Sequence, residues 1–357
     1  MASPLRRSFG VLTLLSIGVL AVAGCAQAVS QEESKSGESA SGGEASSVGG
    51  SLVIYSGRNE ELVGPIIERF EEESRIDVEV RYGDTAELAA TILEEGENSP
   101  ADVFFAQDAG ALGAVADEEI LRELPGEASD QVEERFRDPD GRWVGVSGRA
   151  RVVAYNREAL SEGDLPASIL DFTDPEWQGR IGWAPTNGSF QAFVTALRVI
   201  EGEEVAREWL EGVQANQPRE YDNNLPILEG VASGEIEVGF VNHYYLFRKL
   251  EDEGEGFGAR NYYPQNGDPG ALVNVAGTGI LNTTDNSEES EAFLDFLLSE
   301  EAQQYFANET YEYPLVEGIP INEELTPLSE IETPNIDLGN LDDLEGTLDL
   351  LRETGVL

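Results

Sequence analysis

The chain has 357 residues, and 70 Asp and Glu against 22 Lys and Arg give it a formal net charge of −48. Such a surface repels nucleic acid and anionic lipid, which excludes both as partners bound through charge. One cysteine, Cys25, excludes an internal disulfide, and one histidine, His243, excludes the zinc sites and catalytic triads that need several histidines.

The first 24 residues have the features of a lipoprotein signal peptide. Arg6 and Arg7 precede an apolar stretch, residues 11–23, that is too short to cross a membrane as a mature helix. The small residue directly before Cys25 resembles a lipobox, which implies cleavage before Cys25 and lipid on its sulfur. The chain would then be an extracytoplasmic lipoprotein that contacts the membrane only through its anchor. An ordinary secretory signal with an unrelated cysteine is the alternative.

Residues 25–50 are rich in Ser, Gly, Glu and Ala and contain almost no large apolar side chain. Such a segment cannot bury enough surface to offset its ordering entropy, so a disordered tether is predicted. The remaining residues, 51–357, suit two lobes of ordinary domain size.

The first half of this globular part alternates strands with helices. Strands are expected at 52–55, 77–82 and 102–105, helices at 60–73 and 85–95, and an alanine-rich segment at 107–116. The alternation predicts a parallel α/β sheet. Ligands gather at the carboxyl ends of strands in such sheets, where Tyr55, Arg58, Gln107 and Asp108 are expected.

The second half contains two segments that are expected to cross between lobes, 143–155 and 272–279. Strands are also expected at 181–183 and 236–241, and helices at 190–200 and 290–306. Residues 184–189 form a small polar turn between a strand and a helix N-terminus. This pattern predicts a cradle of backbone N–H groups for an anion.

Tyr244 and Tyr245 follow directly after a predicted strand. Fe³⁺ prefers anionic oxygen donors, and phenolate is the strongest oxygen donor among side chains. A phenol titrates near pH 10 in water, and a bound trivalent ion lowers that value. Consecutive tyrosines point to opposite faces of a strand, so both reach one ion only where the backbone turns, as at a strand-to-helix junction. The alternative, one ring in the core and one at the surface, is our interpretation of Tyr262 and Tyr263.

Seven segments together resemble the ferric-binding periplasmic proteins of bacterial iron importers, which are related in fold to the transferrins. In chain order, these segments are 54–58 (IYSGR), 99–104 (SPADVF), 147–152 (SGRARV), 185–190 (PTNGSF), 242–245 (NHYY), 267–272 (GDPGAL) and 312–315 (EYPL). Each segment alone is a weak signal, whereas their order and spacing are specific.

The resemblance implies that Tyr244 and Tyr245 ligate Fe³⁺. One branch of the family adds a histidine and a glutamate, but Asn59 and Gln107 stand in those places here. Another branch uses a tyrosine after the first strand and completes the shell with carbonate, and Tyr55 fits that role. The alternative for Tyr55 is a strand residue that packs inward. Asp108, Gln107 and Asn59 are further candidate ligands.

The resemblance also implies a synergistic anion, carbonate or phosphate, beside the metal. Residues at matching positions are Asn187, Gly188, Ser189, Asn224 and Asn242. Arg58 and Arg149 or Arg151 could clamp the anion with their planar guanidinium groups. The alternative is that these arginines pair with the abundant surface carboxylates.

The fold implied is a class II periplasmic-binding-protein clamp, with two α/β lobes, crossover strands and a ligand cleft between the lobes. Lobe 1 is expected at 51–147 and about 276–315, and lobe 2 at about 148–275 and about 316–357. The function implied is capture of Fe³⁺ and delivery to an ABC permease by a monomeric binding protein.

Two other functions stay open. A protein of the same fold could bind another cargo, such as an oxyanion, a polyamine or a sugar phosphate. An extracellular hydrolase with two catalytic carboxylates is the other, but the chain has no P-loop, Gly-x-Ser-x-Gly or His-Glu-x-x-His motif. No enzymatic activity is therefore predicted. The acidity itself indicates either a saline habitat or the composition of a GC-rich genome.

Overall fold

The computed structural model describes residues 49–357. Cys25, the predicted signal peptide and residues 25–48 of the predicted tether lie outside the described residues. Within 49–357, no helix combines the length and the apolar character that crossing a membrane requires.

A first group of strands is parallel. β1 (Ser51–Ser56) lies between β2 (Asp77–Tyr82) and β3 (Val103–Ala106). The helices of this group bury one face against the sheet; α1, for example, buries Leu62 and Ile66 at helical spacing. These helices are α1 (Glu60–Ser74), α2 (Thr85–Glu95), α3 (Ala109–Asp117), α4 (Gly126–Ser129), α9 (Ser287–Leu297) and α10 (Glu300–Asn308).

A second group of strands surrounds β7 (Val238–Asn242). β5 (Ile181–Trp183) is parallel to β7 and to β6 (Arg219–Glu220), whereas β8 (Ala259–Tyr262) pairs with a strand of the connection between the groups. Its helices are α5 (Gly188–Glu201), α6 (Glu203–Ala215), α7 (Asn224–Ser233), α8 (Tyr244–Glu253) and α11 (Leu344–Glu353).

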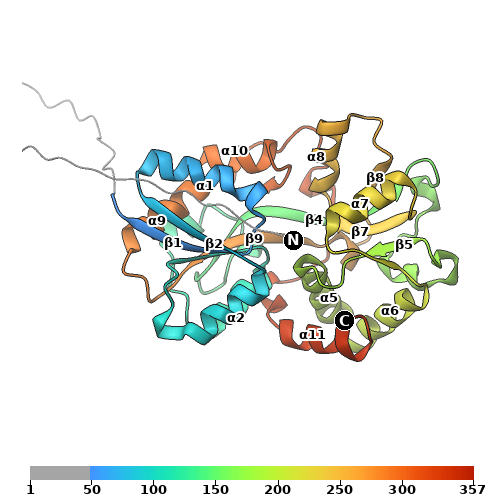
Figure 1. Cartoon of the computed structure of the whole chain (residues 1–357), viewed down its shortest axis with the longest axis horizontal. Coiled ribbons are helices and arrows are strands. Elements are labelled where there is room, and N and C mark those ends of the chain that lie inside the picture. The colour runs from blue at the N-terminus through green and yellow to red at the C-terminus, as the bar shows by residue number, and fades with distance from the viewer. Residues whose placement is uncertain (1–48) are drawn as a thin grey trace, which may run out of the picture. The chain divides into compact units, whose positions relative to one another are not determined.

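One long strand joins the two groups. β4 (Val144–Asn156) has 13 residues, all of them buried. Its first half pairs with β9 (Val273–Ile280) and β10 (Tyr313–Pro314), and its second half pairs with β7 and β8. Figure 1 shows β4 and β9 between the two groups of helices. The two segments that were expected to cross between lobes therefore coincide with β4 and β9.

The buried apolar side chains form separate clusters. The largest contains Phe104 and Trp143 of the first group, and a second contains Trp183 and Trp209 of the second group. A third, smaller cluster lies under α7. The lobe boundaries expected from the sequence stay a prediction.

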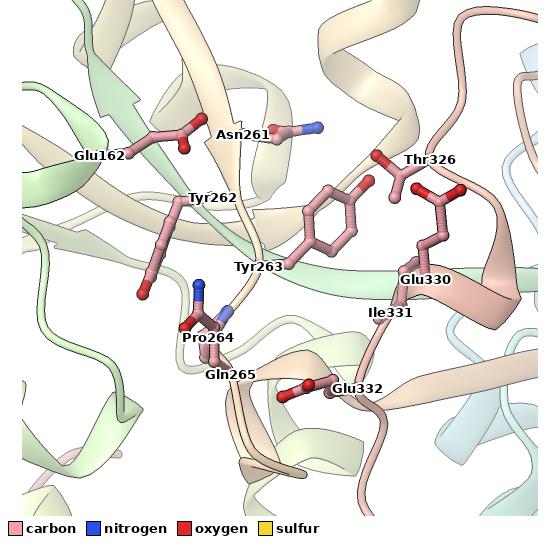
Figure 2. A pocket seen from close by; sticks show the side chains of 10 residues that line it. All are labelled: Glu162, Asn261, Tyr262, Tyr263, Pro264, Gln265, Thr326, Glu330, Ile331 and Glu332. Carbon is pink, nitrogen blue, oxygen red and sulfur yellow. The ribbon is translucent and has the colours of Figure 1, made fainter.

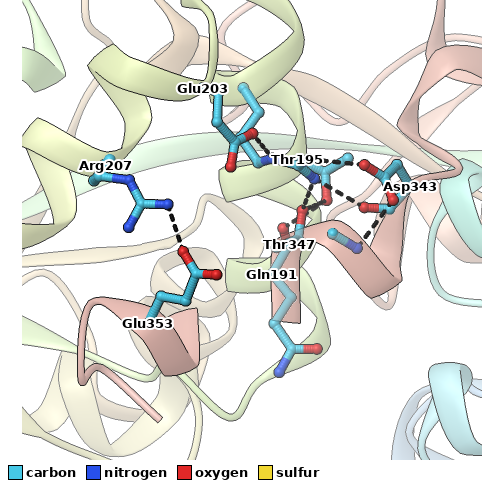
Figure 3. A network of polar contacts seen from close by, with 9 residues as sticks. Gln191, Thr195, Glu203, Arg207, Asp343, Thr347 and Glu353 are labelled. Carbon is cyan, nitrogen blue, oxygen red and sulfur yellow. Dashed lines mark hydrogen bonds and ion pairs between the residues drawn. The ribbon is translucent and has the colours of Figure 1, made fainter. Parts of the chain in front are cut away.

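The C-terminal segment contacts both large clusters. Leu338 and Leu341 pack in the first cluster, whereas Leu350 and Leu351 of α11 pack in the second. Polar contacts also attach α11 to its neighbours, as Figure 3 shows. The hydroxyls of Thr195 and Thr347 lie 2.7 Å apart, and Arg207 pairs with Glu353 at 2.6 Å.

The parallel arrangement expected for the first three strands is confirmed, because β1 pairs in parallel with β2 and with β3. The sheet as a whole is mixed, because β9 runs antiparallel to β3 and β4 runs antiparallel to β9 and β7. One expectation about the secondary structure is wrong. The single helix expected at 290–306 is two helices, α9 and α10. The chain is extended at Ser299, whose side chain accepts a hydrogen bond from the Ala302 N–H at 3.3 Å and so begins a new helix.

Candidate functional site

The two consecutive tyrosines lie at a strand-to-helix junction. β7 ends at Asn242, and α8 begins at Tyr244. Because the backbone turns helical here, the rings of Tyr244 and Tyr245 stack, with centroids 4.3 Å apart and an angle of 28° between their planes. Tyr244 is buried and Tyr245 is half-buried. The backbone turn that a shared ligand requires is therefore present.

His243 supports this turn from inside the protein. Its Nδ1 accepts a hydrogen bond from the Ala150 N–H at 3.2 Å, and its ring stacks on Tyr313 with centroids 4.7 Å apart. The side chain of Asn261 donates to the His243 carbonyl at 2.9 Å. Burial, and then the nearby Arg149 charge, lowers the pKa of His243 to about 3, so the ring is neutral at ordinary pH.

Three buried arginines come from two places in the fold. Arg149 and Arg151 lie on the same face of β4, two residues apart, and Arg58 lies in the turn between β1 and α1. Arg58 Nη2 lies 2.6 and 2.8 Å from the two carboxylate oxygens of Glu312, and neither side chain is exposed. Arg149 donates to the carbonyl oxygen of Gln107.

These arginines keep unused hydrogen-bonding capacity. Five buried guanidinium nitrogens of these three arginines have no hydrogen-bond partner within the described part of the chain: Nε and Nη1 of Arg58, Nε and Nη1 of Arg149, and Nη2 of Arg151. Buried donors are nearly always paired in native proteins, so such a set calls for an acceptor. An oxyanion suits planar guanidinium donors best.

The arginines and the tyrosines also influence one another's charge. Burial, followed by the charge of Arg149, lowers the pKa of Arg151 to about 9, while Tyr245 and Tyr244 oppose that change. Burial also lowers the pKa of Arg149, with a further contribution from Arg58. Burial, then Tyr245 and Glu312, raises the pKa of Tyr244 well above 10.0, and Arg58 and Arg149 oppose it. The phenol of Tyr244 is therefore protonated until something replaces its proton.

A polar network links the predicted anion cradle to β7. The Asn187 side chain caps α5 by accepting from the Ser189 N–H at 3.2 Å, with Gly188 between them as the first helical residue. Asn224 donates to Asn187 and to the Ser189 hydroxyl at 3.2 and 3.3 Å, and it accepts from the Asn242 N–H at 3.1 Å.

Arg151 connects this network to the arginines. Its Nη1 donates to the Ser189 hydroxyl at 3.4 Å and to Asn242 Oδ1 at 3.3 Å. The structure thus brings together the tyrosine pair, the three arginines and all five cradle residues.

Tyr55 does not join this group. Its hydroxyl donates to Glu95 at 3.2 Å and accepts from Arg81 Nη1 at 3.1 Å, and the Arg81 guanidinium lies over its ring. The reason is its strand position: Tyr55 is the register partner of Arg81 on β2, so the two side chains share a face of the sheet.

The side chains of two of the other three expected oxygen donors cap helices. Asn59 accepts from the Glu61 N–H at 2.8 Å at the start of α1, and Asp108 accepts from the Ala111 N–H at 2.9 Å at the start of α3. Gln107 contributes its backbone, through the carbonyl that accepts from Arg149.

Glu312 is the site residue that sequence reasoning missed. It lies in one of the resembling segments, 312–315, but that segment predicts no role for it. With 70 acidic residues in the chain, nothing in the local sequence distinguishes the one that is completely buried against Arg58. Among residues 49–357, no three His, Cys, Asp or Glu side chains gather as a metal site.

Known proteins that are similar to this chain indicate its family. The profile of a family described as bacterial extracellular solute-binding protein matches residues 98–335. The Fe(3+)-binding periplasmic protein of Serratia marcescens is 32% identical over 88% of this chain and 94% of its own length.

Two solved structures of relatives have the same fold. Iron-bound HitA of Pseudomonas aeruginosa superposes with a TM-score of 0.82 at 34% identity and covers 85% of this chain and 99% of its own. The Trichodesmium protein IdiA (FutA), in complex with iron and citrate ligands, superposes with a TM-score of 0.73 at 28% identity over 85% of this chain and 99% of its own.

The fold is thus the mixed α/β fold of periplasmic binding proteins, and the family is one of binding proteins rather than enzymes, as the sequence predicted. The chain belongs to the bacterial extracellular solute-binding proteins and, among them, to the ferric iron-binding periplasmic protein family.

Proposed function

We propose that this protein captures Fe³⁺ through the phenolates of Tyr244 and Tyr245 and delivers it to an ABC permease. The observation that carries the proposal is the stacked tyrosine pair at the start of α8, next to buried arginines. Fe³⁺ is cargo here, and it replaces the phenolic protons. A relative whose name states Fe(3+) binding and a relative whose structure is iron-bound support the same cargo.

A synergistic anion completes the proposed site. Two buried carboxylates, Glu312 and Asp108, lie near the three buried guanidinium groups, which leaves an excess of one positive charge and five unpaired nitrogens. Carbonate or phosphate, held by Arg58, Arg149 and Arg151 and by the cradle at Asn187–Ser189, would satisfy both the charge and the donors. Iron with citrate in the Trichodesmium relative supports an oxyanion beside the metal.

The ligand set proposed from this chain's own residues is the tyrosine pair together with the anion. The side chains of Tyr55, Asn59 and Asp108 make hydrogen bonds elsewhere, and these bonds would have to break before the side chains could reach the metal. Gln107 stays next to Arg149 as a neighbour of the anion.

The experiment that tests the proposal is a ferric titration followed by visible absorption. Phenolate bound to Fe³⁺ gives a charge-transfer band, so the protein is expected to become coloured up to one equivalent of iron. Removal of carbonate and phosphate is expected to shift or weaken the band. A colourless titration, together with saturable phosphate binding, would instead identify an oxyanion as the cargo.

We also propose that the protein acts as a monomer held at the membrane by lipid on Cys25. The small residue before Cys25, directly after an apolar stretch, supports this. The Cys25→Ser variant is expected to appear in the soluble fraction, as judged by fractionation and immunoblotting. Retention in the membrane fraction would contradict the anchor and leave the iron site unaffected.

A further inference from the structure

A cavity lies beyond the end of β8, and neither Tyr244 nor Tyr245 lines it. Its volume is about 340 Å³, which is enough for a small organic molecule. Figure 2 shows Tyr262 and Tyr263 on opposite sides of the chain that leaves β8, with Thr326 and Glu330 next to the Tyr263 ring. The cavity thus lies where β8 meets the segment 326–332.

The lining of this cavity is anionic and aromatic. It contains the carboxylates of Glu162, Glu330 and Glu332 and the two tyrosines, and it contains no Lys, Arg or His. Aromatic faces and carboxylates together favour an organic cation over a neutral or anionic molecule.

One buried polar atom of the lining, Oδ1 of Asn261, has no hydrogen-bond partner within residues 49–357. The Tyr263 hydroxyl, by contrast, lies next to the side chains of Tyr313 and Thr326. Asn261 Oδ1 is an amide oxygen, so it can only accept a hydrogen bond. The orientation of the amide is set by Nδ2, which donates to the His243 carbonyl. An occupant with N–H donors would satisfy this acceptor, whereas a bare metal cation or a quaternary ammonium would not donate.

The same residues connect the cavity to the support of the tyrosine pair. Asn261 holds the His243 carbonyl at 2.9 Å, one residue before Tyr244. Thr326 accepts from the Tyr313 hydroxyl at 2.7 Å, and the Tyr313 ring stacks on the His243 ring. Two lining residues therefore reach His243 from different directions.

We propose that this cavity binds a small primary ammonium ion, such as the end of an alkyl diamine, and that its occupancy stabilises the turn at His243. The ammonium group donates to Asn261 Oδ1 and lies among the carboxylates, and its alkyl part lies against the tyrosine rings. The proposal is independent of iron binding.

Calorimetric titration of the metal-free full chain with 1,4-diaminobutane tests the site. The titration is done in molar NaCl, where weak counter-ion binding to the acidic surface is screened. One saturable site is expected for the diamine and none for 1,4-butanediol, its uncharged analogue. Equal binding of the diol, or no saturable binding of the diamine, would overturn the proposal.

Variants of the lining residues, compared with a control variant outside the cavity, test where the diamine binds. The Glu162→Gln/Glu330→Gln double variant is expected to weaken diamine binding about threefold to tenfold, and Tyr263→Leu by a similar factor. Glu323→Gln is the control and is expected to have no effect on diamine binding. Glu323 is an exposed acid that precedes Thr326 in the chain and does not line the cavity. An equal loss in Glu323→Gln, or unchanged binding in both lining variants, would mean counter-ion binding only.

Amide hydrogen exchange tests the connection to His243 without iron. The diamine is expected to slow exchange in the peptide 242–247 by at least about threefold, because it fixes Asn261 against the His243 carbonyl. Slower exchange restricted to 259–265 and 326–332 would overturn the connection to the turn. The Glu162→Gln/Glu330→Gln variant should show neither change.

Discussion

Tyr244 lies in surroundings that disfavour its charged form. Burial raises the pKa of its phenol well above 10.0, so the ring carries its proton in the absence of metal. A trivalent ion that replaces this proton gains a charged donor, whereas a phenylalanine ring offers none. Tyr244→Phe and Tyr245→Phe are each expected to weaken ferric binding by at least about a hundredfold and to remove most of the visible band, as measured by competition with a chelator.

Other tyrosines serve as controls for this experiment. Tyr221 bonds to Glu235, and Tyr55 bonds to Glu95 and Arg81, so Phe at either position is expected to leave the visible band unchanged. Loss of the band in Tyr55→Phe would return Tyr55 to the ligand set. Normal iron binding by the Tyr244→Phe/Tyr245→Phe double variant would contradict the iron site itself.

His243 predicts an acid sensitivity of the fold. Its pKa is about 3 in the folded protein against 6.5 ordinarily, so below pH 6.5 the unfolded chain binds a proton that the folded protein does not. Stability is therefore highest above pH 6.5 and falls as the pH decreases towards 3, by up to about 1.4 kcal/mol per pH unit. In His243→Asn, denaturant unfolding at pH 8, 6 and 5 is expected to show a smaller loss on acidification.

The carboxylates of the chain also take up protons as the pH falls, and this changes the stability of both proteins. The effect of His243 is therefore the difference in pH dependence between the wild type and His243→Asn. Asn lacks the titrating group but keeps polar atoms near the Ala150 amide. Equal slopes in the wild type and His243→Asn would show that His243 does not bind its extra proton on unfolding.

Regular elements with a clear period were predictable from the sequence. β2, α2 and β5 have the predicted bounds, because alternation and helical spacing are local properties. Strand direction depends on which strands come to lie side by side, and so the antiparallel course of β9 was missed. The break at Ser299 was missed because the apolar spacing continues on both sides of it.

In the candidate site, too, the features that depend on local sequence were predictable and those that depend on distant contacts were not. Tyr244 and the Asn187 turn follow strand ends, where ligands gather, and the structure brings them together with Arg151, which lies within β4. The face on which the Tyr55 side chain lies depends on its register with β2, and the burial of Glu312 depends on its contact with Arg58, 254 residues away. Neither can be read from neighbouring residues.

The contact between Arg58 in the β1–α1 turn and Glu312 beside β10 is expected to matter for stability. Glu312→Gln would leave the Arg58 charge buried without its partner, which costs about 3–5 kcal/mol of unfolding free energy in denaturant titrations. Replacement of both residues by Met removes both charges and is expected to recover most of that loss.

A surface ion pair provides the matched comparison. Glu353→Gln breaks the partly exposed pair with Arg207 that Figure 3 shows, and is expected to cost about 1 kcal/mol or less. A loss in Glu312→Gln no larger than in Glu353→Gln would mean that Arg58 finds another partner or water.

The charge of the whole chain predicts stabilisation by salt. Its 70 acidic residues against 22 basic ones repel one another, and the screening length falls from about 10 Å at 0.1 M to about 3 Å at 1 M salt. The melting temperature is expected to rise between 0.05 and 1 M NaCl, and sucrose at equal osmolality controls for effects unrelated to charge. A flat or falling curve would favour genome composition over a saline habitat as the origin of the acidity.

β4 also constrains how this chain can vary between species. It joins the two strand groups and carries Arg149 and Arg151, and a bulge between Gly145 and Ser147 sets its register before the arginines. Because successive side chains alternate, the gain or loss of one residue within 148–155 would move one part of the strand to the opposite face of the sheet. Natural insertions and deletions should therefore collect in surface loops such as 157–164. The number of residues between the bulge and the end of β4 should stay constant even where most identities have changed.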